Sequence, residues 1–188
     1  MTRIIKVYVY LVVGLLSSPW GEALGLELGQ TLPALSITDK GECLLVDGEA
    51  LFVPWQSASA GGPVQIFEYV AARAGIDKLN QPFYQALAAA GLRDIIPVTQ
   101  LVNSADALWG TAGLVAGEVA KSKKAHPEDR LVVDALGVGR QRWQLQKKSA
   151  AIIVLDGEGN IRLLQEGGMT AAEAEQAILL LRELNPGQ

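Results

Sequence analysis

Short apolar runs separated by turn signals dominate the first half of the chain. Residues 32–56 combine such runs with turn signals at residues 39–41 (DKG) and 47–48 (DG), which predict one or two small β-hairpins. Residues 63–70 alternate apolar and polar positions and predict a further strand. Residues 95–103 are apolar and rich in β-branched side chains, so we expect a strand that is buried on both faces.

Helical spacing of apolar residues marks three later segments. The first is predicted at residues 80–91, where a proline lies in the first turn and a glycine ends the segment. The second covers residues 110–124, whose final lysines complement the negative end of the helix dipole. The third begins at a capping box formed by Thr170 and Glu173, and apolar residues follow it at helical spacing.

The remaining strands complete a recognisable order of elements. One strand is predicted at residues 130–135, and two more flank the turn sequence DGEG at residues 156–159, which is typical of a β-hairpin. Two strand-helix-strand units followed by an antiparallel hairpin and a terminal helix predict an α/β fold. Its mixed sheet is expected to be covered on both faces, with the first hairpin as an N-terminal extension.

The N-terminus has the three-part pattern of a secretory signal peptide. Two basic residues precede an uncharged run at residues 7–16, and small residues follow it. A run of about ten residues is too short to cross roughly 30 Å of hydrocarbon, so a permanent anchor is the weaker interpretation. We predict that residues 1–23 are cleaved after Ala23, with Gly25 as the second choice. Residues 24–188 are expected to form a single periplasmic domain, although export beyond the periplasm stays open.

Charge argues against a nucleic-acid partner. The chain has 16 basic and 20 acidic residues, and the signal segment holds two of the basic and one of the acidic residues, so the mature net charge is −5. Nucleic-acid binding depends on neutralising phosphates, so we expect no such partner. We also expect no stable membrane insertion after cleavage, because no later segment approaches the length of a membrane span.

The chain has one cysteine, Cys43, which therefore cannot form an internal disulfide. It lies in the predicted hairpin between Glu42 and Leu44, far along the chain from any predicted helix start. We expect a buried, inert thiol. The alternative is an exposed thiol that forms an intermolecular disulfide or serves a single-cysteine oxidoreductase.

Two stretches resemble proteins of the thioredoxin-like fold, in the form with an N-terminal hairpin found in exported thiol reductases and peroxiredoxins. The stretch GQTLPALSITDKGE resembles the entry segment of these proteins, and IIVLDGEGNIRLLQEG resembles the hairpin before their final helix. A more specific resemblance covers essentially the whole mature chain. Its segments, together with the signal peptide, are similar to the YtfJ family of small periplasmic proteins: ITDKGE, LVNSADA, VDALGV, WQLQKKSAAIIVLDGEGNI and GGMTAAEAEQAILLL. That resemblance implies a thioredoxin-like protein of undetermined role, and some members are labelled transcriptional regulators.

The same resemblance identifies a position at which redox chemistry is missing. The redox cysteines of thioredoxin-like enzymes follow the first central strand, where this chain has RAGI at residues 73–76. None of these side chains can attack a disulfide or a peroxide. The enzymes also place a cis-proline before the final hairpin, where this chain has Ala150. We expect a trans peptide before Ala150, since a non-proline cis bond costs roughly 2.5–4 kcal/mol.

Arg73 is the first candidate site residue, because an arginine near a helix N-terminus faces the positive end of the helix dipole. It could form an anion pocket with free backbone amides. The simpler alternative is a salt bridge to Asp77, Asp106 or Glu68. Asp106 and Asn103 also follow the second central strand, at the end where open α/β sheets bind ligands. Capping the next helix is the simpler role for both.

Trp143 and Ser149 complete the candidate cleft. Both belong to the loop at residues 136–149, which carries several basic side chains and suggests an acidic partner or an anionic ligand; an ordinary solvated loop is the alternative. Trp143, like Trp55 and Trp109, could line a cleft, although packing in the core is favoured for each. Ser149 has no histidine near it in the sequence, so an acyl-transfer site is disfavoured.

The remaining motifs do not suggest a cofactor or a metal. His126 is the only histidine, and a metal site needs three or four convergent ligands, so we predict neither a metal nor another cofactor. The sequence thus predicts an exported, redox-inactive binding or interaction module and favours a non-enzymatic role over an enzymatic one. The alternatives are an oxidoreductase that uses Cys43 and, less favoured, a transcriptional regulator.

Overall fold

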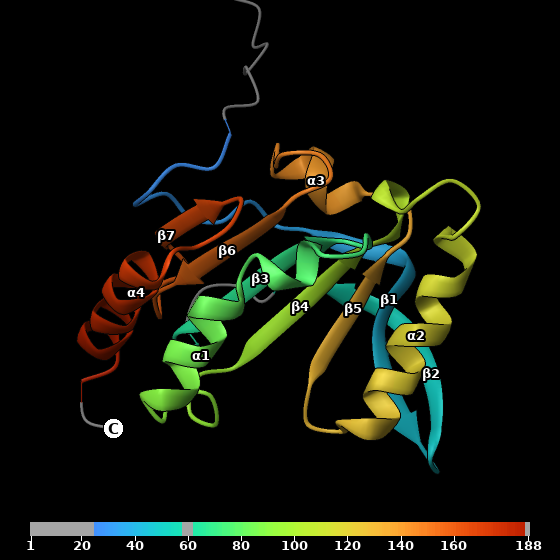
Figure 1. Ribbon diagram of the computed structural model, residues 1–188, viewed down its shortest axis with the longest axis horizontal. Helices are drawn as coiled ribbons and strands as arrows, with labels where there is room; N and C mark the ends of the chain where they lie inside the picture. The colour runs from blue at the N-terminus through green and yellow to red at the C-terminus, as the bar shows by residue number, and fades with distance from the viewer. Residues whose placement is uncertain (1–24, 58–61, 187–188) are drawn as a thin grey trace, which may run out of the picture.

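The computed structural model describes residues 25–57 and 62–186, and the strands of this part form one mixed sheet in the order β2-β1-β5-β4-β3-β6-β7 (Figure 1). The predicted signal peptide, residues 1–23, lies outside the described residues. The strands are β1 (Ser36–Val46), β2 (Glu49–Gln56), β3 (Gln65–Ala71), β4 (Val98–Asn103), β5 (Arg130–Asp134), β6 (Ala150–Leu155) and β7 (Ile161–Glu166).

The helices connect the strands and cover both faces of the sheet. They are α1 (Gln81–Ala89), α2 (Ala112–Ala125), α3 (Val138–Arg142) and α4 (Ala171–Leu184), with short 3₁₀ helices at Ile76–Lys78 and Ser104–Asp106. The α4 helix begins at the predicted capping box, in which the Thr170 hydroxyl accepts from the backbone N–H of Glu173 and the Glu173 carboxylate accepts from that of Thr170.

Parallel strands form the centre of the sheet and antiparallel strands form its flanks. β3, β4 and β5 are parallel because α1 and α2 carry the chain back between them. β6 pairs antiparallel with β3, and β7 pairs antiparallel with β6. The β6–β7 turn is closed by Asp156, whose Oδ1 accepts from the backbone N–H groups of Glu158 and Asn160.

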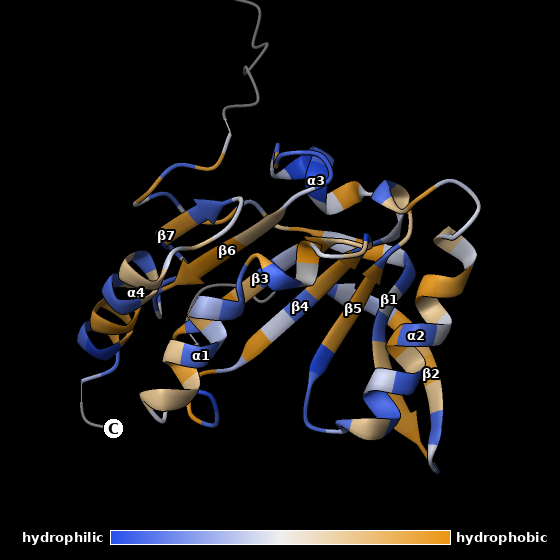
Figure 2. Ribbon diagram, viewed as in Figure 1, coloured by the Kyte–Doolittle hydropathy of each residue, from blue (hydrophilic) through white to orange (hydrophobic). Residues whose placement is uncertain are grey.

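The register of the sheet places α1, α2 and α4 on one face. Ile66 packs beneath α1 and pairs with Val98, while Leu131 packs beneath α2 and pairs with Gln100. Val98 and Gln100 are two residues apart in β4 and therefore point to the same face. Figure 2 shows that hydrophobic residues follow the central strands, whereas α3 is hydrophilic.

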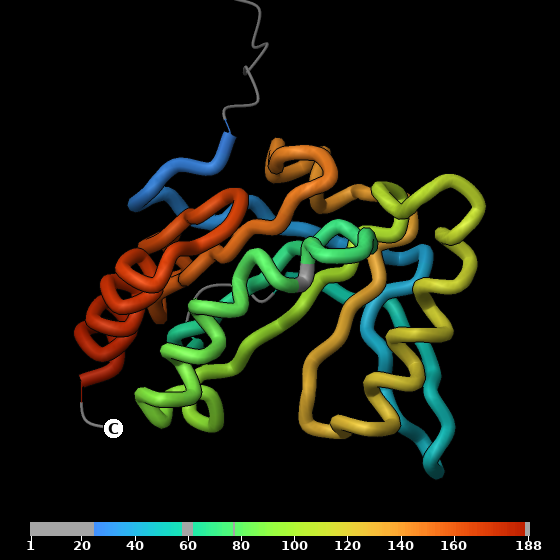
Figure 3. The backbone as a smooth tube through the Cα atoms, viewed as in Figure 1, coloured from blue at the N-terminus to red at the C-terminus, as the bar shows by residue number. Residues whose placement is uncertain are grey.

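The opposite face is closed by α3 and by the N-terminal described segment. Leu32, Leu35 and Trp143 pack there against Phe67 of β3. The N-terminal segment also runs beside the β6–β7 hairpin, as Figure 3 shows, and Thr31 forms a bridge with Asn160. The predicted mixed α/β sheet with an N-terminal hairpin is thus confirmed.

Residues 32–56 form one hairpin, and the predicted second turn at residues 39–41 is instead a bulge within β1. The register of β1 against β2 shifts between Ile37 and Glu42. Gly41 has φ of +80°, and a Cβ there would collide with the carbonyl oxygen of Val53. The DKG sequence therefore marks a position where the hairpin backbones approach too closely for any side chain.

The prediction that the strand at residues 95–103 is buried on both faces is wrong. β4 begins at Val98, and its residues alternate between buried and half-buried. The half-buried set, Val98, Gln100 and Val102, faces α1 and α2. The reason is the position of α2, which packs over β1, β2 and β5 and leaves this side of β4 partly open.

Candidate functional site

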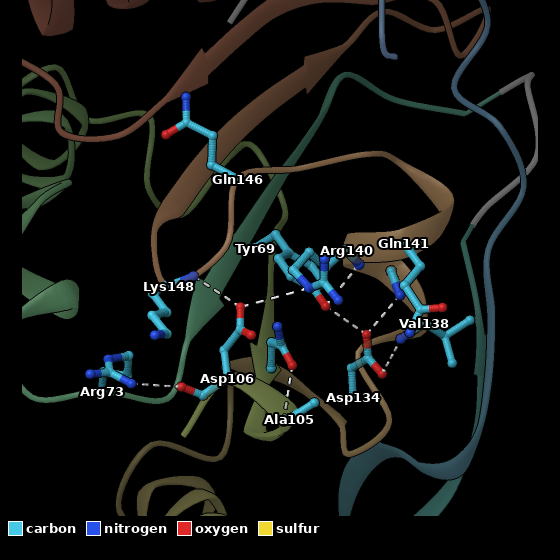
Figure 4. Close-up of polar contacts among 12 residues, drawn as sticks. Tyr69, Arg73, Ala105, Asp106, Asp134, Val138, Arg140, Gln141, Gln146 and Lys148 are labelled. Atoms are coloured by element: carbon cyan, nitrogen blue, oxygen red, sulfur yellow. Dashed lines mark hydrogen bonds and ion pairs between the residues drawn. The ribbon is translucent and has the colours of Figure 1, made fainter. Parts of the chain in front are cut away.

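The parallel strands β3, β4 and β5 end at the same edge of the sheet, where three loops meet. We call these loops, residues 72–75, 104–111 and 135–149, the strand-end surface. The predicted site residues Arg73, Asp106 and Ser149 all belong to it, and Figure 4 shows its polar contacts. Ligands of open α/β sheets bind at this end of the strands. The geometry of the strand-end surface therefore indicates whether it is suited to docking a partner or to catalysis.

Asp134, the last residue of β5, fixes α3 on this surface. Its carboxylate is fully buried and accepts hydrogen bonds from the backbone N–H groups of Val138 (2.9 Å) and Gly139 (2.7 Å). The Tyr69 hydroxyl donates a third hydrogen bond at 2.7 Å and accepts one from the backbone N–H of Arg140 at 2.9 Å. Burial raises the pKa of Tyr69, and the negative charge of Asp134 raises it further.

Asp106 connects all three loops. Its Oδ2 accepts a hydrogen bond of 3.0 Å from the backbone N–H of Lys148 and lies 3.8 Å from Nε of Arg140. Its backbone carbonyl accepts a hydrogen bond of 3.3 Å from Nη1 of Arg73. The side chains of Asp106 and Arg140 are only 12% and 20% exposed, so this ion pair is partly shielded from water.

Asn103 performs the capping role that was the simpler sequence prediction. Its Oδ1 accepts from the backbone N–H of Ala105 at 3.0 Å and caps the 3₁₀ helix Ser104–Asp106. The side chain is fully buried, and its Nδ2 has no hydrogen-bond partner among the described residues. Asn103 therefore holds the loop at residues 104–111 from a buried position and is not exposed to a ligand.

The α-helix N-terminus that the predicted anion pocket requires does not directly follow Arg73. The residues after Arg73 form a turn and then a 3₁₀ helix of three residues, and α1 begins only at Gln81. The half-buried guanidinium donates to the Asp106 carbonyl and holds the loop that follows β3. Of the three predicted salt-bridge partners, Glu68 accepts hydrogen bonds from neutral side chains, and Asp106 accepts from Arg73 through its backbone carbonyl. The side chain of Asp77, the third, lies outside the described part of the chain.

Trp143 does not line an open cleft, so its place among the candidate cleft residues is wrong, and the core packing that the sequence favoured for it is confirmed. The side chain is 1% exposed, its indole N–H donates to the Pro33 carbonyl at 2.8 Å, and its ring packs against Phe67 and Tyr69. Burying so large an apolar ring stabilises the fold more than exposing it to a ligand site would.

The other tryptophans divide between core and surface. Trp55 is buried beside Phe67, as the sequence favoured. Trp109 is fully exposed on the strand-end surface, so the core packing favoured for it is wrong. Ser149 is half-buried, and its carbonyl accepts from the backbone N–H of Ala71 at 3.0 Å. The peptide before Ala150 is trans, as expected, because the described residues contain no cis peptide bond.

Cys43 is buried, as the sequence predicted. It is 0% exposed and packs with Val119, Leu131 and Val133 between β1 and α2. Burial raises the pKa of the thiol, and Lys123 offsets only part of this effect. A thiol that is both enclosed and protonated is a poor nucleophile.

Sequence reasoning missed a second polar cluster, which is centred on Glu68 in the middle of β3. The side chain is 2% exposed, and its carboxylate accepts hydrogen bonds from Asn80, Tyr84 and Gln100. Burial raises the pKa of Tyr84, and Glu68 raises it further. The signal in the sequence was Glu68 as the single charged residue of the strand predicted at residues 63–70.

Two negative findings apply to the described residues alone. Within residues 25–57 and 62–186, no three histidine, cysteine or acidic side chains gather closely enough to hold a metal ion. His126 is exposed, and its Nδ1 lies 3.8 Å from Oε1 of Glu128. In the same part of the chain, every helix is too short or too polar to cross a membrane.

A family model described as a bacterial protein of unknown function, YtfJ_HI0045, matches residues 26–184. The chain belongs to the YtfJ family. It is 33% identical over 159 residues to the uncharacterized protein YtfJ of Escherichia coli (strain K12), a match that covers 84% of this chain and 86% of the relative.

Solved structures similar to this YtfJ-family protein have the thioredoxin-like fold. A thiol-disulfide isomerase from Corynebacterium glutamicum has a TM-score of 0.52 at 17% identity, and the match covers 85% of this chain and 98% of the isomerase chain. A peroxiredoxin-like protein from Aquifex aeolicus has a TM-score of 0.51 at 12% identity, with coverages of 86% and 89%. At such identities the likeness establishes the fold alone.

Proposed function

We propose that this YtfJ-family protein is an exported binding module that uses a redox-inactive thioredoxin-like scaffold. The observation that carries the proposal is the structure of the loop after β3. Arg73 is held there by the carbonyl of Asp106, while the only cysteine is enclosed elsewhere, beneath α2. The strand-end surface is thus built by hydrogen bonds and an ion pair, and no thiol contributes to it.

The position of Cys43 weighs against the alternative of a single-cysteine oxidoreductase. Thiol–disulfide exchange needs a thiolate that can reach the substrate sulfur in line. Cys43 is fully buried, and its raised pKa lowers the thiolate fraction at neutral pH. Redox catalysis would therefore require the hairpin to separate from α2.

Docking is favoured by the side chains that the strand-end surface exposes. Arg142, Lys147 and Lys148 supply positive charge, and Trp109 and Leu136 supply apolar contact area. Aromatic and basic side chains together are typical of binding anchors. The partner that fits is an acidic periplasmic protein or an anionic small ligand.

Export is part of the proposal and rests on the N-terminal sequence. The pattern at residues 1–23 favours a cleavable signal and a mature chain in the periplasm. A mature net charge of −5 also disfavours a role as a transcriptional regulator. Cell fractionation with an antibody against the protein tests this point, and a cytoplasmic chain with an intact N-terminus would contradict it.

Site-specific photo-crosslinking in living cells tests the docking surface. A photoreactive residue replaces Trp109 in one variant and Lys147 in another, and it replaces exposed Leu179 of α4 in the matched control. We expect discrete adducts from positions 109 and 147 and none from position 179. Equal crosslinking at all three positions, or at position 179 alone, would contradict the proposal.

A further inference from the structure

A cavity of about 600 Å³ opens on the helix-covered face of the sheet, at the end opposite the strand-end surface. It lies where α2 leaves the side of β4 uncovered, between the loop that follows α1 and the start of β5. Ligand pockets in proteins have volumes of roughly 300–1,000 Å³, so its size suits a small organic molecule. Its polar lining residues are Glu68, Tyr84, Arg93, Asp94, Gln100, Glu128, Asp129 and Arg130.

Glu68 is the most buried charged residue of this lining. Its Oε1 accepts from Nδ2 of Asn80 at 2.9 Å, and its Oε2 accepts from the Tyr84 hydroxyl and from Nε2 of Gln100, each at 2.7 Å. All three donors are neutral, and none of the ion pairs among the described residues involves Glu68. A buried carboxylate without a counter-charge is unfavourable, and a cation placed beside it would offset part of that cost.

The acceptor capacity around Glu68 is also incompletely used. A carboxylate offers about four lone-pair positions, and three of these are occupied. Asn80 is fully buried, and its Oδ1 has no hydrogen-bond partner among the described residues. Asn80 is not part of the cavity lining, so the acceptor position that a ligand with N–H donors can reach is the one left on Glu68.

Both basic residues of the lining pair with carboxylates other than Glu68, and the Arg93 guanidinium also lies 5.9 Å from the centre of the Tyr84 ring. Nη2 of Arg93 lies 3.7 Å from Oδ1 of Asp129, and Nε of Arg130 lies 3.5 Å from Oε1 of Glu42. Asp94 and Glu128 add further negative charge to the lining. The lining thus carries four acidic and two basic side chains, a balance that favours cations over anions.

We propose that this cavity binds a small organic cation, a primary ammonium or guanidinium compound, with its charged head at Glu68. One N–H group of the ammonium or guanidinium donates to the free acceptor position of Glu68. Ile96, Val98 and Leu131 provide the apolar wall for the carbon chain. The site is separate from the strand-end surface, so it goes beyond the proposed docking function and can fail independently of it.

Isothermal titration calorimetry of the mature chain, residues 24–188, tests the proposal with cadaverine and agmatine. Two control compounds have carbon chains of the same length as cadaverine. Pentanediol carries no charge, and glutarate carries negative charge. We expect both cations to bind, neither control compound to bind, and Glu68→Gln to weaken cation binding at least about tenfold. Glu175→Gln, on the exposed side of α4, is the matched control and should bind as the unaltered protein does.

A second variant separates loss of binding from loss of folding. Val98→Phe leaves Glu68 intact and fills the cavity from its wall, and circular dichroism of both variants reports whether they are folded. Folded Val98→Phe should lose cation binding. Three results would overturn the proposal: no binding of either cation at millimolar concentration, equal binding of pentanediol, or undiminished binding by folded Glu68→Gln or Val98→Phe.

Discussion

The Tyr69 hydroxyl donates a hydrogen bond of 2.7 Å to Asp134 and thereby joins two strands that are not neighbours in the sheet. Tyr69 lies in β3 and Asp134 ends β5, with β4 between them. Both residues are buried, and the same hydroxyl accepts from the backbone N–H of Arg140. This contact positions α3 and, through Arg140, the ion pair with Asp106.

Tyr69→Phe is expected to lower the free energy of unfolding by about 1–3 kcal/mol. The change leaves the Asp134 carboxylate short of one donor and the Arg140 N–H without an acceptor. Urea denaturation measures the loss. Hydrogen exchange should also become faster at the Arg140 amide and stay unchanged in α4, and an unaltered urea midpoint would contradict this account of α3.

Alkaline pH should destabilise the protein through Tyr69 and Tyr84. Both pKa values are raised by burial and by a neighbouring carboxylate, so the folded state retains protons that the unfolded state releases. The stabilisation is fully present below roughly pH 10, the ordinary tyrosine pKa, and decreases as the pH rises above it. Urea midpoints measured on both sides of that pH should show the decrease, and it should be smaller in Tyr69→Phe and in Tyr84→Phe. An equal decrease in the unaltered protein and both variants would rule out these two tyrosines as the cause.

Gly41 and Gly48 offer a matched pair of substitutions in the N-terminal hairpin. Their φ values are +80° and +79°, so alanine strains the backbone at both positions by about 1–2 kcal/mol. Only at Gly41 would the added Cβ also meet the carbonyl oxygen of Val53, since nothing lies within 4 Å of it at Gly48. Thermal melting should therefore show a larger loss for Gly41→Ala, and equal losses would argue against the bulge.

Tryptophan fluorescence should separate the strand-end surface from the core. Trp109 is fully exposed, whereas Trp55 and Trp143 are 4% and 1% exposed. Acrylamide should quench the mature chain mainly through Trp109, and Trp109→Phe should remove most of the quenchable emission. Strong quenching that persists in this variant would mean that a core tryptophan is accessible to solvent.

The sequence predicted the elements whose signals are local. The turn at residues 156–159 and the capping box at Thr170 and Glu173 each lie within a few neighbouring positions, and both formed as predicted. α3 was predicted as loop because its five residues have little helical signal of their own. They are held by Asp134 and by Tyr69, which is about seventy residues away along the chain.

The candidate site was harder to predict for the same reason. Arg73 follows β3 and Asp106 follows β4, as their order in the sequence indicated, because strand order determines which loops meet. Burial of Trp143 depends on contacts with Phe67 and Tyr69 that no local pattern reveals. The Glu68 cluster likewise joins residues from β3, β4 and the start of α1, and only the folded chain brings them together.

Reaction of Cys43 with a small disulfide reagent tests the absence of redox chemistry most directly. The mature chain is mixed with the reagent across a range of pH, both folded and unfolded in urea. We expect the folded thiol to react far more slowly than the unfolded one at neutral pH, because it is enclosed and its pKa is raised. A folded thiol that reacts as fast as the unfolded one, or faster, would contradict the proposal of a redox-inactive binding module.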